Sequence, residues 1–246
     1  MKVILNFSPN FDAKKRKKSE IKFIVFHYTG MKKEKDAINR LTSSKSKVSS
    51  HYFINKFGKI ITLVPVSYSA WHAGISYWKN YKSLNKYSIG IEISNPGHES
   101  NYKKFSKKQI NSVIKLSKFL IKKYRIKPNC ILAHSDIAPN RKKDPGEKFP
   151  WKYLSQNKIS NWHDFSQNQL LKFRNLEIRN IEKNEFFQNL FKIGYPKIYK
   201  NISSSYLRKL TKAFQRRFRQ ELINGFIDKE CLKISENLLK KINKFS

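Results

Sequence analysis

The first strong hydrophobic pattern in the chain is the segment 22–27, Lys-Phe-Ile-Val-Phe-His. Its apolar residues fall on both faces of an extended chain, as in a strand at the centre of a sheet. Segment 88–94 alternates instead, with isoleucines on one face and Gly90, Glu92 and Ser94 on the other. The two patterns predict two core strands, and they place Glu92 on the face opposite the isoleucines.

Other patterns predict the elements around these strands. Residues 51–64 read as a hairpin that turns at 56–59, and residues 36–41 as a short helix. Ser106 and Gln109 form a capping box before apolar residues at helical spacing, which predicts a helix ending at Tyr124, before Pro128. A short strand at 130–134 and a loop rich in Pro, Gly and Lys at 135–151 complete this half of the chain.

The pattern changes after Trp162, where strand-like segments give way to helical spacing. Segments 165–193, 204–220 and 229–243 are all predicted as helices. The predicted fold class is therefore α/β, with a mixed central β-sheet flanked by helices, plus a small C-terminal all-α module. We expect a domain over residues 1–164 and a second, helical domain over residues 165–246.

The chain is strongly basic. It carries 52 Lys and Arg against 17 Asp and Glu, for a net charge of +35. Such a field attracts polyanions, but abundant Lys, Asn and Ile with scarce Ala and Gly are equally typical of an AT-biased genome. The basic residues spread along the whole chain and no nucleic-acid recognition motif is present, so nucleic acid is not an expected partner.

Composition also bounds the compartment and the assembly. Two cysteines, Cys130 and Cys231, cannot make a disulfide framework and are predicted to be inert thiols. No apolar run approaches the length of a transmembrane helix, and the apolar stretch at the N-terminus is too short for a signal peptide. We expect a cytoplasmic monomer; the alternative is a periplasmic or outer-membrane-associated protein whose export signal precedes this sequence.

The candidate chemistry starts from His27, His134 and Asp144. Zinc catalysis needs three protein ligands and one open position. Both histidines end predicted strands, and Asp144 follows in the loop with Pro145 and Gly146. Taken singly each residue is weak evidence, because a histidine at a strand end is more often structural than a ligand, and no short zinc motif joins them.

Five motifs occur in one order around these residues. They are Phe26-His27-Tyr28-Thr29, Trp71-His72-Ala73-Gly74-Ile75-Ser76, Ser88-Ile89-Gly90-Ile91-Glu92, Ala133-His134-Ser135-Asp136-Ile137-Ala138-Pro139 and Arg141-Lys142-Lys143-Asp144-Pro145-Gly146. Over about residues 20–160 the chain resembles the type 2 N-acetylmuramoyl-L-alanine amidases, the zinc amidases of bacterial peptidoglycan turnover. Segments 190–195 and 213–218 resemble helices of the small peptidoglycan-binding-like domain found on one branch of that family. The chain has few of the glycine-rich turns that are typical of such domains.

The resemblance implies a site and a reaction. It makes His27, His134 and Asp144 the ligands of one Zn²⁺, Glu92 the catalytic glutamate and Lys142 a basic residue beside the metal. The implied reaction hydrolyses the amide bond between the lactyl group of (anhydro-)N-acetylmuramic acid and L-alanine of the stem peptide. Peptidoglycan or muropeptide fragments are the expected partners. A non-catalytic peptidoglycan-recognition module of the same fold is the alternative.

The same motifs suggest residues that bind substrate. The Trp71 face suits a sugar ring, although a plain core aromatic is nearly as good an interpretation, and His72 and Ala73 are expected beside it. The planar fork of Arg141 could bind a peptide carboxylate. His51 also falls in a family motif, and we favour a structural role near the site for it.

Overall fold

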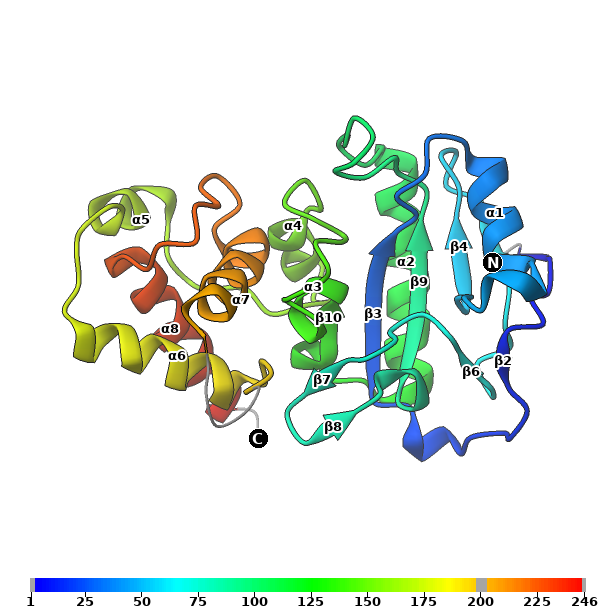
Figure 1. Cartoon of the computed structure of the whole chain (residues 1–246), viewed down its shortest axis with the longest axis horizontal. Helices are drawn as coiled ribbons and strands as arrows, with labels where there is room; N and C mark the ends of the chain where they lie inside the picture. Colours follow the sequence, from blue (N-terminus) through cyan, green and yellow to red (C-terminus); the bar gives the residue numbers. More distant parts are fainter. Residues whose placement is uncertain (1–2, 198–202, 245–246) are drawn as a thin grey trace.

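The computed structural model describes residues 3–197 and 203–244, and a mixed six-stranded sheet stands at its centre (Figure 1). The strand order is β1 (Val3–Leu5), β5 (Ile60–Thr62), β4 (Tyr52–Ile54), β9 (Ser88–Ile93), β3 (Phe23–Tyr28) and β10 (Ile131–Ala133). β4 and β5 pair antiparallel, and the other neighbours pair parallel. The predicted α/β class with a mixed sheet is confirmed.

Helices cover both faces of this sheet. α2 (Lys107–Tyr124) begins at the predicted Ser106 cap and packs on the face that carries the isoleucines of β9 and Phe26 of β3. α1 (Glu34–Thr42) covers the opposite face over β4 and β5, where it packs against Phe53. Because side chains alternate along a strand, the face under α1 also carries Glu92 and His27.

The C-terminal part of the chain is helical, as predicted. It comprises α5 (Gln167–Phe173), α6 (Asn180–Ile193), α7 (Ser204–Phe218) and α8 (Lys229–Lys244), which lie together on one side of the sheet (Figure 1). Their apolar side chains share one cluster with Phe23 and Val25 of β3 and Leu132 of β10. We call residues 165–246 the helical module; its described residues pack directly onto the sheet.

The remaining elements are short. They are strands β2 (Phe11–Asp12), β6 (Ser69–Ala70), β7 (Tyr77–Trp78) and β8 (Tyr81–Lys82), helices α3 (His134–Ile137) and α4 (Trp151–Gln156), and 3₁₀ turns at 18–20, 44–46, 84–86 and 128–130. The sequence did not reveal α3, because its first turn depends on the Asp136 carboxylate accepting a hydrogen bond from the Ala133 amide at 2.8 Å. The predicted helix over 165–193 is two helices, α5 and α6.

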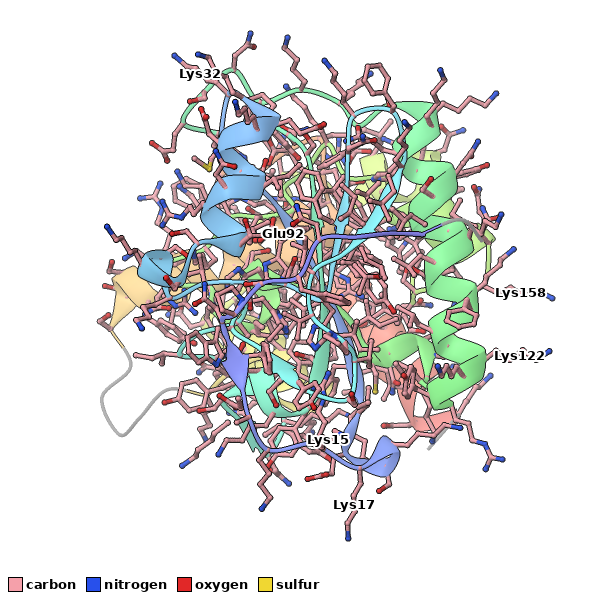
Figure 2. All side chains as sticks on the ribbon, turned by 90° about the vertical axis from the view of Figure 1, so that its right-hand side faces the viewer. Lys15, Lys17, Lys32, Glu92, Lys122 and Lys158 are labelled. Carbon is pink, nitrogen blue, oxygen red and sulfur yellow. The ribbon has the colours of Figure 1, made fainter. Side chains whose placement is uncertain are left out.

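Most of the basic charge lies on the outside. The labelled lysines in Figure 2, such as Lys32 and Lys122, point outward on different sides, while Glu92 lies in the middle of the view. Arg16, inside the basic run 13–18, is an exception: it is buried and donates to the carbonyl oxygens of Val66 at 2.9 Å and Ser88 at 2.7 Å. This arginine therefore has a structural role.

Both cysteines are free thiols, Cys231 buried and Cys130 half-buried. Across residues 3–197 and 203–244, no helix combines the length and the apolar character needed to span a bilayer.

Deletion of the helical module is expected to destabilise the rest of the protein strongly. The deletion exposes Phe23, Val25 and Leu132 and removes Arg217, the partner of the buried carboxylate Asp136. Breaking a buried ion pair alone costs about 3–5 kcal/mol. Urea unfolding of the 1–164 fragment should show a much lower midpoint than the full chain. An unchanged midpoint would mean that the two parts fold independently.

Candidate metal centre

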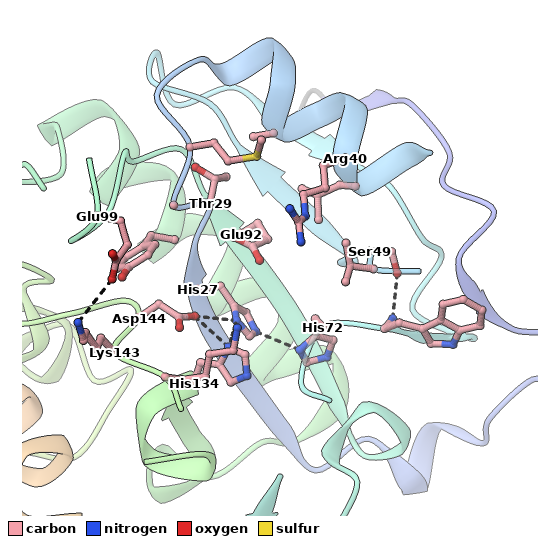
Figure 3. A pocket seen from close by; sticks show the side chains of 18 of the residues that line it. His27, Thr29, Arg40, Ser49, His72, Glu92, Glu99, His134, Lys143 and Asp144 are labelled. Carbon is pink, nitrogen blue, oxygen red and sulfur yellow. Dashed lines mark hydrogen bonds and ion pairs between the residues drawn. The ribbon is translucent and has the colours of Figure 1, made fainter. Parts of the chain in front are cut away.

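A cavity opens at the carboxyl ends of β9, β3 and β10, beneath α1 (Figure 3). Its volume is about 390 Å³, which is enough for part of a sugar-peptide. The lining includes His27, Glu92, His134, Lys142 and Asp144. The cavity thus collects the predicted ligands and both predicted catalytic residues.

Strand register explains why these side chains meet. β3 and β9 run parallel with His27 directly opposite Glu92, so the two side chains leave the same face of the sheet as neighbours. β10 runs parallel to the other edge of β3, with Ala133 opposite Phe26. The next residue, His134, therefore emerges beside His27.

Three atoms of these residues form a tight triangle. His27 Nδ1 lies 2.9 Å from His134 Nδ1, and each nitrogen lies 3.0 Å from Asp144 Oδ2. All three residues are buried, and they are the one group of this kind within residues 3–197 and 203–244. A tetrahedral zinc ion with bonds of about 2.0–2.1 Å keeps its ligand atoms about 3.3 Å apart. The triangle therefore fits a metal ion with little adjustment.

Hydrogen bonds on the far side of each ring turn the Nδ1 atoms towards this centre. His134 Nε2 donates to the Ala73 carbonyl oxygen at 3.2 Å, which leaves Nδ1 with a free lone pair. His27 Nε2 lies 3.0 Å from His72 Nδ1, and His72 Nε2 lies 3.1 Å from the Ser88 hydroxyl, which donates to the Leu84 carbonyl. One tautomer of each ring satisfies the whole chain of donors, as is usual for metal-binding histidines.

Gly90 makes room for this arrangement. A Cβ atom at this position would collide with the ring of His72, which lies directly against the strand. The glycine in the alternating segment 88–94 is thus explained by the histidine that orients His27.

The charge states of His27 and Asp144 also suit a cation. Burial lowers the pKa of His27 to about 4, and the neighbouring His134 adds to the effect. Burial alone would raise the pKa of Asp144, but the facing His134 and His27 outweigh it and hold the pKa well below its usual value. At neutral pH a neutral imidazole and a carboxylate face each other, which are the forms that bind metals.

Glu92 has no hydrogen-bond partner among residues 3–197 and 203–244. It is half-buried, and its shielded Oε2 makes no hydrogen bond to any residue that the structure describes. Burial raises the pKa of Glu92 well above its usual value, and the charge of Asp144 adds to the shift, while Lys142 and Arg40 oppose it. A bound divalent cation would oppose this rise in the pKa of Glu92. The group is therefore set to take up and release a proton inside the cavity.

The residues predicted to bind substrate take different positions. Trp71 lines the cavity and donates from Nε1 to Asp12 at 2.8 Å. Arg141 lines it too, but its guanidinium already donates to the carbonyl oxygens of Ala73 and Ile75, at 2.5 and 2.6 Å. Both predicted groups therefore line the cavity, and Arg141 also holds the chain at Ala73 and Ile75.

Of the other predicted contacts, His72 lines the cavity, whereas Ala73 and His51 do not. The Nδ1 atom of His72 is engaged with His27 and orients its ring. Ala73 is buried, and its carbonyl oxygen orients the ring of His134. His51 is fully buried away from the lining, and its Nδ1 accepts from the Gly90 amide at 3.0 Å. Their positions favour support of the site over contact with a substrate.

Sequence reasoning missed Arg40 and Ser88. Arg40 reaches the cavity from α1, opposite Glu92 (Figure 3). Nothing in the sequence singles it out among 52 Lys and Arg. Ser88 was assigned to the strand, but only the fold brings its hydroxyl to His72.

Acid should destabilise the metal-free protein. The pKa of buried His27 is about 4 in the folded state and about 6.5 when the chain unfolds, and that of His72 is also lowered by burial. Between these values the two histidines bind more protons in the unfolded chain than in the folded one. The single carboxyl of Glu92, whose pKa is raised by burial, acts in the opposite direction, and the two histidines outnumber it, so stability falls as pH drops from about 6.5 towards 4. Urea midpoints at about pH 7.5 and about pH 5 should differ accordingly. Equal midpoints would contradict neutral, buried rings.

The fold and this site define a class: an α/β protein with a mixed sheet and a buried centre of two histidines and one carboxylate. The sequence profile of the N-acetylmuramoyl-L-alanine amidase family matches residues 17–147. The chain belongs to the N-acetylmuramoyl-L-alanine amidase family, as its motifs predicted.

Individual relatives agree with this assignment. The N-acetylmuramoyl-L-alanine amidase AmiD of Escherichia coli is 36% identical over 233 residues, 90% of this chain and 83% of the relative. The structure of AmiD in complex with anhydro-N-acetylmuramic acid-L-Ala-D-γ-Glu-L-Lys superimposes with a TM-score of 0.81 over 90% of both chains. AmpDh3 of Pseudomonas aeruginosa, solved with an anhydromuramic pentapeptide, gives 0.80 at 30% identity over 91% of this chain and 92% of its own.

Proposed function

We propose that this protein is a zinc-dependent N-acetylmuramoyl-L-alanine amidase. It hydrolyses the amide between the lactyl group of N-acetylmuramic acid, or of its anhydro form, and L-alanine of the stem peptide, in cell-wall turnover or recycling. The observation that carries this proposal is the buried triangle of His27, His134 and Asp144 with Glu92 beside it in one cavity. The substrate class follows from the relatives, two of which were solved with anhydromuramic peptides.

His27 and His134 would hold the metal through Nδ1, and Asp144 through Oδ2. Two neutral imidazoles and one carboxylate are a common ligand set of catalytic zinc, which keeps a further position open. The ion would supply a Lewis acid that polarises the amide carbonyl and makes water more acidic.

Glu92 acts as the general base and then as the general acid. Its carboxylate takes a proton from the attacking water as the water oxygen bonds to the amide carbon. When the C–N bond breaks, the same carboxyl group returns the proton to the leaving nitrogen. The products are the lactyl carboxylic acid of the sugar and the free α-amine of the L-alanine peptide.

Basic and aromatic groups complete the site. Lys142 lies near enough to Glu92 and His27 to affect the pKa of both, so its ammonium can stabilise the negative oxygen of the tetrahedral intermediate. Trp71 offers a ring face to the sugar, and Arg141 a positive charge to a peptide carboxylate.

A non-catalytic recognition module is the second candidate. The complete ligand set and the unpartnered Glu92 oxygen argue against it, since a binding module needs neither a metal centre nor a proton acceptor.

The test is incubation of the zinc-loaded protein with anhydro-N-acetylmuramyl tripeptide. Mass spectrometry should detect free anhydro-N-acetylmuramic acid together with a peptide that begins with L-alanine. Binding without either product would support the recognition module. Cleavage at another bond would overturn the proposed specificity.

A further inference from the structure

The three proposed ligands do not have equal support from the sheet. His27 lies on β3, which has β9 on one side and β10 on the other, and its ring is fixed by His72. His134 and Asp144 belong to residues 131–150, which begin with β10 at the edge of the sheet. Their position needs support from outside the sheet.

The helical module supports the first turn of α3 through Asp136. Its carboxylate is completely buried, two residues after His134. Besides holding the Ala133 amide, it accepts from the Tyr195 hydroxyl at 2.9 Å and from the guanidinium of Arg217. Tyr195 follows α6 and Arg217 lies on α7, so both donors belong to the helical module.

Arg217 contacts three separate segments of residues 3–164. Besides its ion pair with Asp136, Nη2 donates to the Ile131 carbonyl oxygen of β10 at 2.8 Å. The guanidinium also lies 4.4 Å from the centre of the Trp151 ring. Its side chain is only 4% exposed, so these contacts are shielded from water and depend on geometry.

Gln220 supports the segment that follows Asp144. Its Nε2 donates to the carbonyl oxygens of Glu147 at 2.6 Å and Phe149 at 2.7 Å. The Ser135 amide donates to the Asp144 carbonyl at 3.0 Å, which ties the two ligand segments to each other. Arg217 at the end of α7 and Gln220, two residues after the helix, thus contact both segments.

We propose that the helical module sets the affinity of the metal centre, with Arg217 and Gln220 as positioning residues for His134 and Asp144. The inference rests on the metal centre proposed above. Ligand atoms must be held within about 0.5 Å of their working positions, and the loss of groups that orient ligands typically lowers metal affinity or activity by about 10- to 100-fold. The helical module then helps to build the active site, whether or not it also binds peptidoglycan.

The experiment measures zinc affinity by chelator competition and the visible spectrum of the cobalt-loaded protein. Arg217→Met leaves Asp136 without its charged partner, and Gln220→Leu removes the two bonds to the Asp144 segment. Each should weaken zinc binding by about 10- to 100-fold and alter the cobalt spectrum. Gln220→Leu decides the matter if Arg217→Met does not fold.

Arg219→Met is the matched control. Arg219 is equally buried and two residues away, but its partners Asp228 and Glu230 both lie within the module. It should lose stability and keep wild-type zinc affinity. Equal weakening in Arg217→Met and Arg219→Met, or wild-type affinity in both Arg217→Met and Gln220→Leu, would overturn the proposal. His134→Ala tests the centre itself: zinc binding that survives this change would instead refute the proposed ligands.

Discussion

Glu92→Gln is expected to lower turnover of anhydro-N-acetylmuramyl peptides by about 10²- to 10⁴-fold, the usual contribution of a positioned acid–base group. Glutamine keeps the size of the side chain but cannot accept a proton from water. Glu92 is not one of the three proposed metal ligands, so the zinc content of the variant should stay at the wild-type level. Steady-state kinetics with product detection by mass spectrometry, and metal analysis of the same samples, measure both effects.

Glu99→Gln provides the control for this change. Glu99 lines the same cavity, but its side chain is 84% exposed and its ion pair with Lys143 spans 3.6 Å at the surface. The same chemical change there should leave turnover nearly unaffected. If Glu92→Gln were as active as Glu99→Gln, another group would have to serve as the base.

The position of Glu92 on the cavity side of the sheet could be predicted from the sequence, because the alternation within a single strand is enough to show which face each residue lies on. Alternation in segment 88–94 put Glu92 on the face opposite the isoleucines, and the structure places those isoleucines under α2 and Glu92 in the cavity. Local patterns of this kind survive folding because strand faces are set by backbone geometry.

The proximity of His27, His134 and Asp144 could not be predicted from local patterns. It depends on β10 pairing beside β3 in parallel register, a contact between segments more than a hundred residues apart. Only resemblance to known motifs linked the three residues beforehand. The roles of His72 and Ala73 were also beyond reach, because they depend on which ring nitrogen or carbonyl faces which neighbour.

The helical module shows the same limit at a larger scale. Helical spacing after Trp162 predicted the helices, and a change of pattern favoured a separate domain. Spacing does not report which apolar faces meet, so it gave no sign that Phe23 and Val25 pack into the module. Nor does it distinguish Arg217, buried against Asp136, from the many solvated basic residues around it.

Removal of the metal is expected to abolish turnover, with a loss of more than about 10³-fold, because several kcal/mol of transition-state stabilisation disappear with the ion. Chelation should produce this loss, and added zinc should reverse it. Asp144→Asn should produce it irreversibly: the amide keeps the shape of the carboxylate but removes the negative charge that faces His27 and His134 at 3.0 Å. Circular dichroism of the metal-free protein at neutral pH should still show the folded state, because the sheet and its core do not depend on the ion. Full activity after chelation, with metal content verified as absent, would refute the zinc mechanism while leaving the family assignment intact.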